Sequence, residues 1–275
     1  MRELRTCPVT GRGVLLNDGW FDAPAPGPAD PAPCWHCAYD GPVITRIDGV
    51  TVVPHPVPAL GIEGDPRPTV VSGGVRRQAI GAHELVFLDG ARGHAGEGEG
   101  ALLAAVAARI ADLRKDTRLR GFGAVRRYTP GGHAVWQVFA VPVELPTTAP
   151  GGWRDAERAH GERILEDAGA TALLAWAPRV PFEAWVLPTL GIAPLARTGP
   201  ELIAAVAGAV DRAVTRIRVA LRDTPLDLVL VDGEPWRVEI LPRLAGASPV
   251  EAATGMPIHG VFPEAAAEFL RDRRA

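Results

Sequence analysis

The sequence predicts an α/β (α+β) protein built from two similar halves, whose strand–helix–strand units form one long antiparallel sheet with flanking helices. Strand-like segments and helical segments alternate along the 275 residues. The helical segments at 101–116 and 199–223 each carry an apolar face with the spacing of an α-helix. Two such halves bury their apolar faces most simply when their sheets join and the helices pack on the result.

A repeat at one fixed offset supports this fold. Apolar positions of the two helices match at an offset of 100 residues, as Leu103 with Ile203 does. At the same offset "WQVFAVP" (136–142) aligns with "WRVEILP" (236–242). Because one offset fits two separate elements, we interpret the chain as a duplicated unit.

The elements follow in chain order. Residues 1–41 are rich in Pro and Gly and are expected to be an irregular arm with a short hairpin near "GRGVLLNDGW". The first half, 42–150, is predicted to hold a hairpin at 42–55, strands at 83–90, 121–128 and 134–145, and the helix at 101–116. The second half, 151–275, is predicted to hold a connecting helix at 151–169, strands at 171–178, 182–188, 226–233 and 235–244, and the helix at 199–223.

Composition excludes several classes of protein. The net charge is −3 and no long basic patch is present, so nucleic acid is not an expected partner. The apolar runs are far shorter than a membrane span, and the N-terminus lacks an apolar signal core. We therefore expect a cytoplasmic protein that does not bind membranes.

The cysteines favour a metal site over a disulfide or redox site. The chain has three cysteines, and Cys34 and Cys37 form a C-x-x-C motif. A redox C-x-x-C usually opens a helix after a strand, whereas this one lies in a proline-rich stretch. Half of a zinc site is the favoured interpretation, and a pair of free thiols is the alternative.

Several motifs resemble the galactose-1-phosphate uridylyltransferase family of the histidine-triad superfamily, over nearly the whole chain. "CPVTGRGVLL" resembles P-x-T-G-x-W-V-L, and "VTVVPHPVPAL" resembles V-x-V-x-P-N-K-F-P-A-L. "VPFEAWVLP" resembles P-F-E-x-W-I-x-P. The most specific match is "EILPRL" followed by "PVEAATGMPIHGVFPEAAAEFLR", which resembles I-E-I-x-P-R, G-F-E-x-x-T-G and P-E-x-A-A-x-x-L-R.

The resemblance implies one structural zinc. In the family, an early C-x-x-C, a histidine after the third strand and the first histidine of H-P-H-[GS]-Q-I-W-A-L-P commonly hold zinc. These ligands fall on Cys34, Cys37, His94 and His133. Two thiolates and two imidazoles complete a tetrahedral site without an open position. His94 is the weakest of the four, and His36, His55 or His83 are substitutes; alternatively, His133 is a surface histidine at a strand end.

The resemblance also locates a missing nucleophile. The second histidine of the family motif attacks the α-phosphorus of a nucleotide sugar. It falls on Val135, and the Gln that holds a phosphate oxygen falls on Gln137. The preceding loop, "VRRYTPGGH", is shorter than the family's loop and lacks its Asn and Ser. A shifted register would put His133 in the nucleophile's place, but Gln137 would then lose its match. We expect the family's double displacement not to operate.

Five residues are candidates for substrate binding. The resemblance assigns a phosphate contact to Gln137 and a hexose contact to Glu251, while Arg126, Arg127 and Arg237 are candidates for an anion site. The alternatives are cross-strand pairing for Gln137, a turn cap for Glu251 and a solvated face for each arginine. The family's second metal site, which uses H-x-H, falls on Pro235 and Arg237, so no second metal is expected.

Two functions remain open. The first is an enzyme that keeps the pocket for a nucleotide or sugar phosphate but uses altered chemistry, without a nucleotidyl-histidine intermediate. The second is a non-catalytic, zinc-stabilised binding or scaffold protein. The clustering of charged and polar residues at the former site favours the enzyme. The resemblance also implies a homodimer in which the C-terminal loop helps to build the partner's site.

Overall fold

The structure is a computed structural model of the chain. It describes residues 2–7, 13–17, 34–71, 73–90, 98–128, 132–145, 153–189, 193–244 and 249–272. The predicted ligand His94 and most of the proline-rich arm lie outside these residues.

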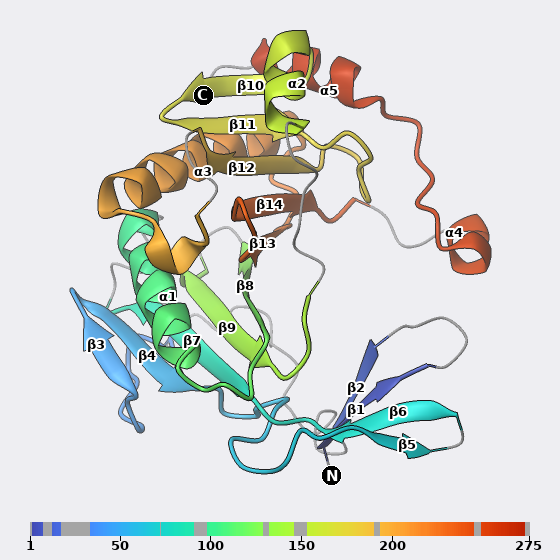
Figure 1. Ribbon diagram of the computed structural model, residues 1–275. Helices are drawn as coiled ribbons and strands as arrows, with labels where there is room; N and C mark the ends of the chain where they lie inside the picture. Colours follow the sequence, from blue (N-terminus) through green and yellow to red (C-terminus); the bar gives the residue numbers. More distant parts are fainter. Residues whose placement is uncertain are drawn as a thin grey trace.

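A ten-stranded antiparallel sheet forms the body of the protein, in the order β10-β11-β12-β14-β13-β8-β9-β7-β4-β3 (Figure 1). The first half supplies β3 (Thr45–Ile47), β4 (Val50–Pro54), β7 (Ala82–Leu88), β8 (Gly121–Tyr128) and β9 (Val135–Val141). The second half supplies β10 (Ile164–Ala168), β11 (Ala170–Leu174), β12 (Ala184–Pro188), β13 (Leu226–Val231) and β14 (Arg237–Pro242). The sheet confirms the predicted fold class.

The strand order is a mirror image about the centre. Outward from the centre, β8, β9, β7, β4 and β3 in one half correspond to β13, β14, β12, β11 and β10 in the other. The central pair, β8 with β13, joins the halves in a register that runs from Tyr128 opposite Leu226 to Gly123 opposite Val231. This symmetry agrees with the duplicated unit that the offset of 100 residues indicates.

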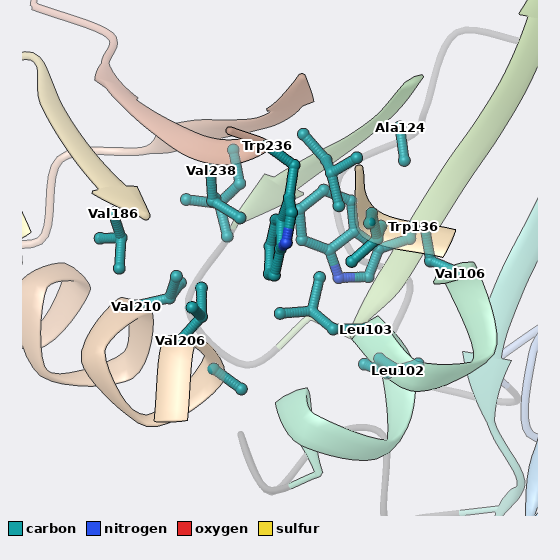
Figure 2. Close-up of a cluster of buried hydrophobic side chains, with 14 of the residues drawn as sticks. Leu102, Leu103, Val106, Ala124, Trp136, Val186, Val206, Val210, Trp236 and Val238 are labelled. Atoms are coloured by element: carbon teal, nitrogen blue, oxygen red, sulfur yellow. The ribbon is translucent and has the colours of Figure 1, made fainter. Parts of the chain in front are cut away.

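Two helices, α1 (Glu99–Leu113) and α3 (Pro200–Ala220), cover one face of the sheet and contact each other. Their apolar faces bury the residues that the helical spacing predicts, including Leu103 and Ile203. Trp136 and Trp236, from the equivalent strands β9 and β14, lie fully buried in this core (Figure 2). Each indole N–H donates to a residue near the start of a helix: Trp136 to Glu99 and Trp236 to Thr198, both at 2.8 Å.

The remaining elements differ from the sequence prediction in four places, of which the C-terminal helices are the last. The segment 151–169 is not one helix: α2 (Trp153–His160) ends before Gly161, which has φ of 71°, and β10 follows. A left-handed glycine is a common helix terminator. The described part of the arm is more regular than expected, because β1 (Arg2–Thr6) and β2 (Gly13–Asn17) pair with each other. They form a four-stranded sheet with β5 (Thr69–Val71) and β6 (Gly74–Gln78), which sequence patterns missed.

Two C-terminal helices were also missed: α4 (Pro249–Thr254) and α5 (Pro263–Arg271). The helix α5 packs on β10 and β11, whereas α4 lies away from the sheet on an extended arm (Figure 1). Among the described residues, no helix is both long and apolar enough to cross a membrane.

Candidate functional site

Gln137 and Val135 lie on the sheet face opposite to α1 and α3, which we call the second face. Side chains alternate along a strand, so Val135 and Gln137 share a face while Trp136 between them enters the helix-covered core. The register continues this face across the sheet: Gln137 pairs with Val125, Val125 with Val229, and Val229 with Glu239. The second face is therefore where the candidate ligand contacts have to lie.

Val135 has an apolar role in this setting. It packs against a small cluster formed by Val53, Leu85 and Phe87, with Tyr39 at its edge. An aliphatic side chain offers neither a nucleophile nor a proton donor. Residue 135 therefore contributes packing to the second face and no reactive group.

Cys34, Cys37 and His133 come together at the edge of the second face. The Sγ atoms of Cys34 and Cys37 each lie 3.6 Å from Nδ1 of His133. Zinc bonds of about 2.3 Å to sulfur and about 2.0 Å to nitrogen, at a tetrahedral angle, give a sulfur–nitrogen separation of about 3.6 Å. Each sulfur–nitrogen distance thus matches that of two ligands on one tetrahedral zinc ion.

The orientation of His133 also suits a metal. Its Nε2 lies 2.9 Å from the carbonyl oxygen of Leu88, which can only accept a hydrogen bond, so the ring proton is on Nε2. The lone pair of Nδ1 then faces the thiols, as in metal sites where a carbonyl orients the ligating imidazole. Donor set and orientation both fit zinc.

His36 is the described candidate for a fourth ligand. Its Nδ1 lies 3.9 Å from Sγ of Cys34, and its ring stacks on His133 at 5.0 Å. Among the residues that the structure describes, Cys34, His36 and His133 form the group whose ligand atoms all lie within 4.8 Å of one another; Cys37 is outside this group and joins the site through its 3.6 Å contact with His133. His55 and His83, the other substitutes, are not in that group.

Arg126 lies apart from the other candidates. Val125 faces Gln137, so the next residue points to the opposite face, where Arg126 is buried and forms an ion pair with Glu99 at the start of α1. Glu99 also accepts the hydrogen bond from Trp136. Arg126 therefore lies in the core and does not approach Gln137, although the sequence predicted that both contact the substrate.

The other three candidates are spread over the second face and beyond it. Arg127 is half exposed and pairs with Asp227 at 3.3 Å. Arg237 stacks on Trp185 and donates to Glu239 at 2.7 Å. Three strand spacings, about 14 Å, separate β14 from β9. Glu251 is in α4, which lies on the extended arm away from the strand β9 that carries Gln137 (Figure 1).

His55 and His83, which the sequence offered only as substitute zinc ligands, form a stacked pair beside Gln137. The rings of His55 and His83 lie 3.9 Å apart and nearly parallel, and Nε2 of His83 lies 3.3 Å from Oε1 of Gln137. Burial, and then the neighbouring His55, lower the pKa of His83 to about 4. The sequence pattern that could have predicted this placement is the alternation in "HELVFLDG", which puts His83 and Leu85 on the face that carries Gln137.

Solved structures share this fold over nearly the whole chain. An ADP-glucose phosphorylase from Arabidopsis thaliana with bound ADP-glucose matches with a TM-score of 0.71 and 20% identity, covering 99% of each chain. A uridylyltransferase matches with a TM-score of 0.74 and 18% identity, covering 98% of this chain and 97% of its own. No family model and no curated protein matches the sequence. These likenesses confirm the predicted fold and, at the level of fold, the resemblance to the uridylyltransferases.

Proposed function

We propose that this chain, which has the fold of a uridylyltransferase and of an ADP-glucose phosphorylase, binds a nucleotide or a sugar phosphate on the second face of its first half. The observation that carries the proposal is the placement of Gln137 on that face, two residues beyond Val135 and with its amide oxygen held by His83. An amide beside Val135 can donate hydrogen bonds to phosphate oxygens. Arg127, on the same face, is half exposed in its pair with Asp227 and is a second candidate contact.

The proposed chemistry differs from a double displacement. A covalent nucleotidyl intermediate requires a nucleophilic atom in line with the α-phosphorus, and Val135 has none. Any group transfer on this face would then be direct, with the acceptor attacking phosphorus while the leaving phosphate departs. The residues of this chain would bind and orient the substrate.

Zinc, held by Cys34, Cys37, His133 and a fourth ligand, belongs to the proposal as a structural ion. A closed set of four protein ligands leaves no open position for substrate. When bound, the ion would cross-link the turn at 34–37 to the start of β9. Its chemistry is therefore cross-linking rather than catalysis.

Calorimetric titration with ADP-glucose and UDP-glucose tests the proposal. We expect binding by the wild type, and a loss of at least about tenfold in affinity for Gln137→Glu, since a carboxylate would repel a phosphate. Incubation with either nucleotide sugar, radiolabelled in the α-phosphate, is expected to leave no label on the protein.

Arg212→Ala is the matched control, because this exposed arginine of α3 pairs with Glu166, far from Gln137. It should bind as the wild type does. A stable labelled adduct would contradict the role given to Val135. Wild-type protein that binds neither sugar in the millimolar range would favour the scaffold alternative.

We also propose a homodimer, in which Glu251 of one protomer contacts the second face of its partner. The arm that carries it exposes Met256, Ile258 and Phe262, whose exposed fractions are 63%, 61% and 75%. Exposed apolar residues of this size often mark an interface. Sedimentation equilibrium should give twice the chain mass of 29.0 kDa, and a single-chain mass at micromolar concentration would exclude the dimer.

A further inference from the structure

We propose that His83 is a positioning residue: it fixes the amide of Gln137 so that the amide nitrogen, and not the oxygen, faces the ligand's phosphate. This inference rests on the proposed function of the second face. In this inference, the contact between Gln137 and the phosphate depends on the orientation that His83 gives to the amide.

The protonation of His83 is determined by a backbone group. The N–H of Ala59 lies 3.1 Å from Nδ1 of His83, and a backbone N–H can only donate. Nδ1 therefore carries no proton, and the single proton of the neutral ring is on Nε2. That nitrogen lies 3.3 Å from Oε1 of Gln137, so it donates to the amide oxygen.

The chain segment that supplies Ala59 is held at both ends. The N–H of His55 donates to the carbonyl of His83 at 3.0 Å, and the N–H of Gly81 donates to the carbonyl of Gly61 at 2.7 Å. Gly81 has φ of 151°, and a Cβ there would meet the carbonyl oxygen of Ala140 at 2.0 Å. The donor to His83 is thus fixed by the backbone rather than by a mobile side chain.

The surroundings keep His83 neutral. His55, stacked on it at 3.9 Å, also accepts a backbone N–H at Nδ1, from Val57 at 3.1 Å. The neighbouring carboxylate of Glu84 points to the helix-covered face and pairs with Arg109 of α1. With burial and His55 lowering the pKa of His83 to about 4, the Nε2–H donor persists throughout the neutral pH range.

The orientation of Gln137 follows from these contacts. The amide oxygen is taken by His83, and within the described part of the chain the amide nitrogen has no hydrogen-bond partner. The nitrogen carries two protons, whereas an ionised phosphate offers only acceptors. Without His83 the amide could turn over and present its oxygen, which would repel the phosphate.

A double-mutant cycle tests the inference, with ADP-glucose affinity as the measured quantity. We expect His83→Leu and Gln137→Met each to weaken binding by about tenfold to a hundredfold, the range that corresponds to the loss of one hydrogen bond to a charged group. The double variant should bind no more weakly than the weaker single variant, because His83 acts through Gln137. His259→Leu, which removes a histidine bonded to Pro178 in the second half, should leave affinity unchanged.

The outcomes separate the two hypotheses. A merely structural role of His83 would weaken ADP-glucose binding whether or not Gln137 is present. If the wild type binds and the two fold-losses in affinity multiply in the double variant, the positioning role is therefore wrong while the proposed function stands. If the wild type binds and His83→Leu binds equally well, the positioning role is also wrong. If the wild type binds no nucleotide sugar, the proposed function fails and this inference fails with it.

Nuclear magnetic resonance of the imidazole nitrogens gives a second readout that needs no ligand. The ring of His83 should be the neutral Nε2–H tautomer at pH 7 and should become protonated only near pH 4. An Nδ1–H tautomer, or protonation near pH 6.5, would overturn the inference even in a protein that binds ADP-glucose.

Discussion

A Cys37→Ser variant is expected to contain no zinc and to unfold well below the wild type. Ligand binding to the native state stabilises it by about 4 kcal/mol when free zinc is a thousandfold above its dissociation constant. For a chain of this size that corresponds to a fall in midpoint of about 8 to 16 °C. Metal analysis and calorimetry of protein purified without chelator measure both quantities.

The third cysteine provides the control for this prediction. Cys7 directly follows β1 in the four-stranded sheet and, among the described residues, is not part of the group of Cys34, His36 and His133. Cys7→Ser should therefore retain about one equivalent of zinc and the wild-type midpoint. Wild-type protein with less than about half an equivalent of zinc would exclude the site, as would a Cys37→Ser variant that melts with the wild type.

Arg126→Ala should destabilise the fold by about 3–5 kcal/mol, whereas Arg127→Ala should cost less than about 1 kcal/mol. Arg126 is buried and pairs with Glu99, which also accepts the indole N–H of Trp136. Removing the guanidinium leaves a carboxylate in the core without its counter-charge. Arg127 is half exposed in its pair with Asp227. Urea unfolding of the two variants gives the comparison.

A third variant distinguishes whether Arg126→Ala destabilises the fold through the lost ion pair or through lost packing. Replacing Glu99 by glutamine and Arg126 by methionine removes both charges, keeps the volume and leaves an amide oxygen to accept the indole N–H of Trp136, so this double variant should be less damaging than Arg126→Ala. Equal losses for Arg126→Ala and Arg127→Ala would show that the ion pair with Glu99 contributes no more than a surface pair. Equal losses would also contradict the burial of Arg126.

The sequence predicted the core best where apolar residues repeat with the spacing of one helix or one strand. The spacing of Leu103 and Ile203 in the helices, and the alternation around Trp136 and Trp236, reproduce the core because each pattern is set by neighbours along one element. The repeat offset then related the two halves. The mirrored strand order follows from that duplication together with antiparallel pairing.

The errors lie where one position decides between two structures. Gly161 ends α2, and the predicted helix ran past it because "ERILEDAG" also has helical spacing. Arg126 and Arg127 were grouped by sequence proximity, although adjacent strand residues must face opposite sides. The stacking of His55 on His83 could not be anticipated, because it depends on how the segment after β4 bonds to the start of β7.

The pairing at the centre of the mirrored sheet determines how the two halves would behave if they were separated. At its centre β8 and β13 satisfy each other's backbone groups. Either half alone would expose that strand as a bare edge, which is a template for pairing with any other chain. Because β8 and β13 belong to one chain, their pairing is intramolecular and does not depend on protein concentration. A proteolytic cut between the halves would therefore leave them associated as long as the β8–β13 ladder holds, and would expose a sticky edge on each half once it opens.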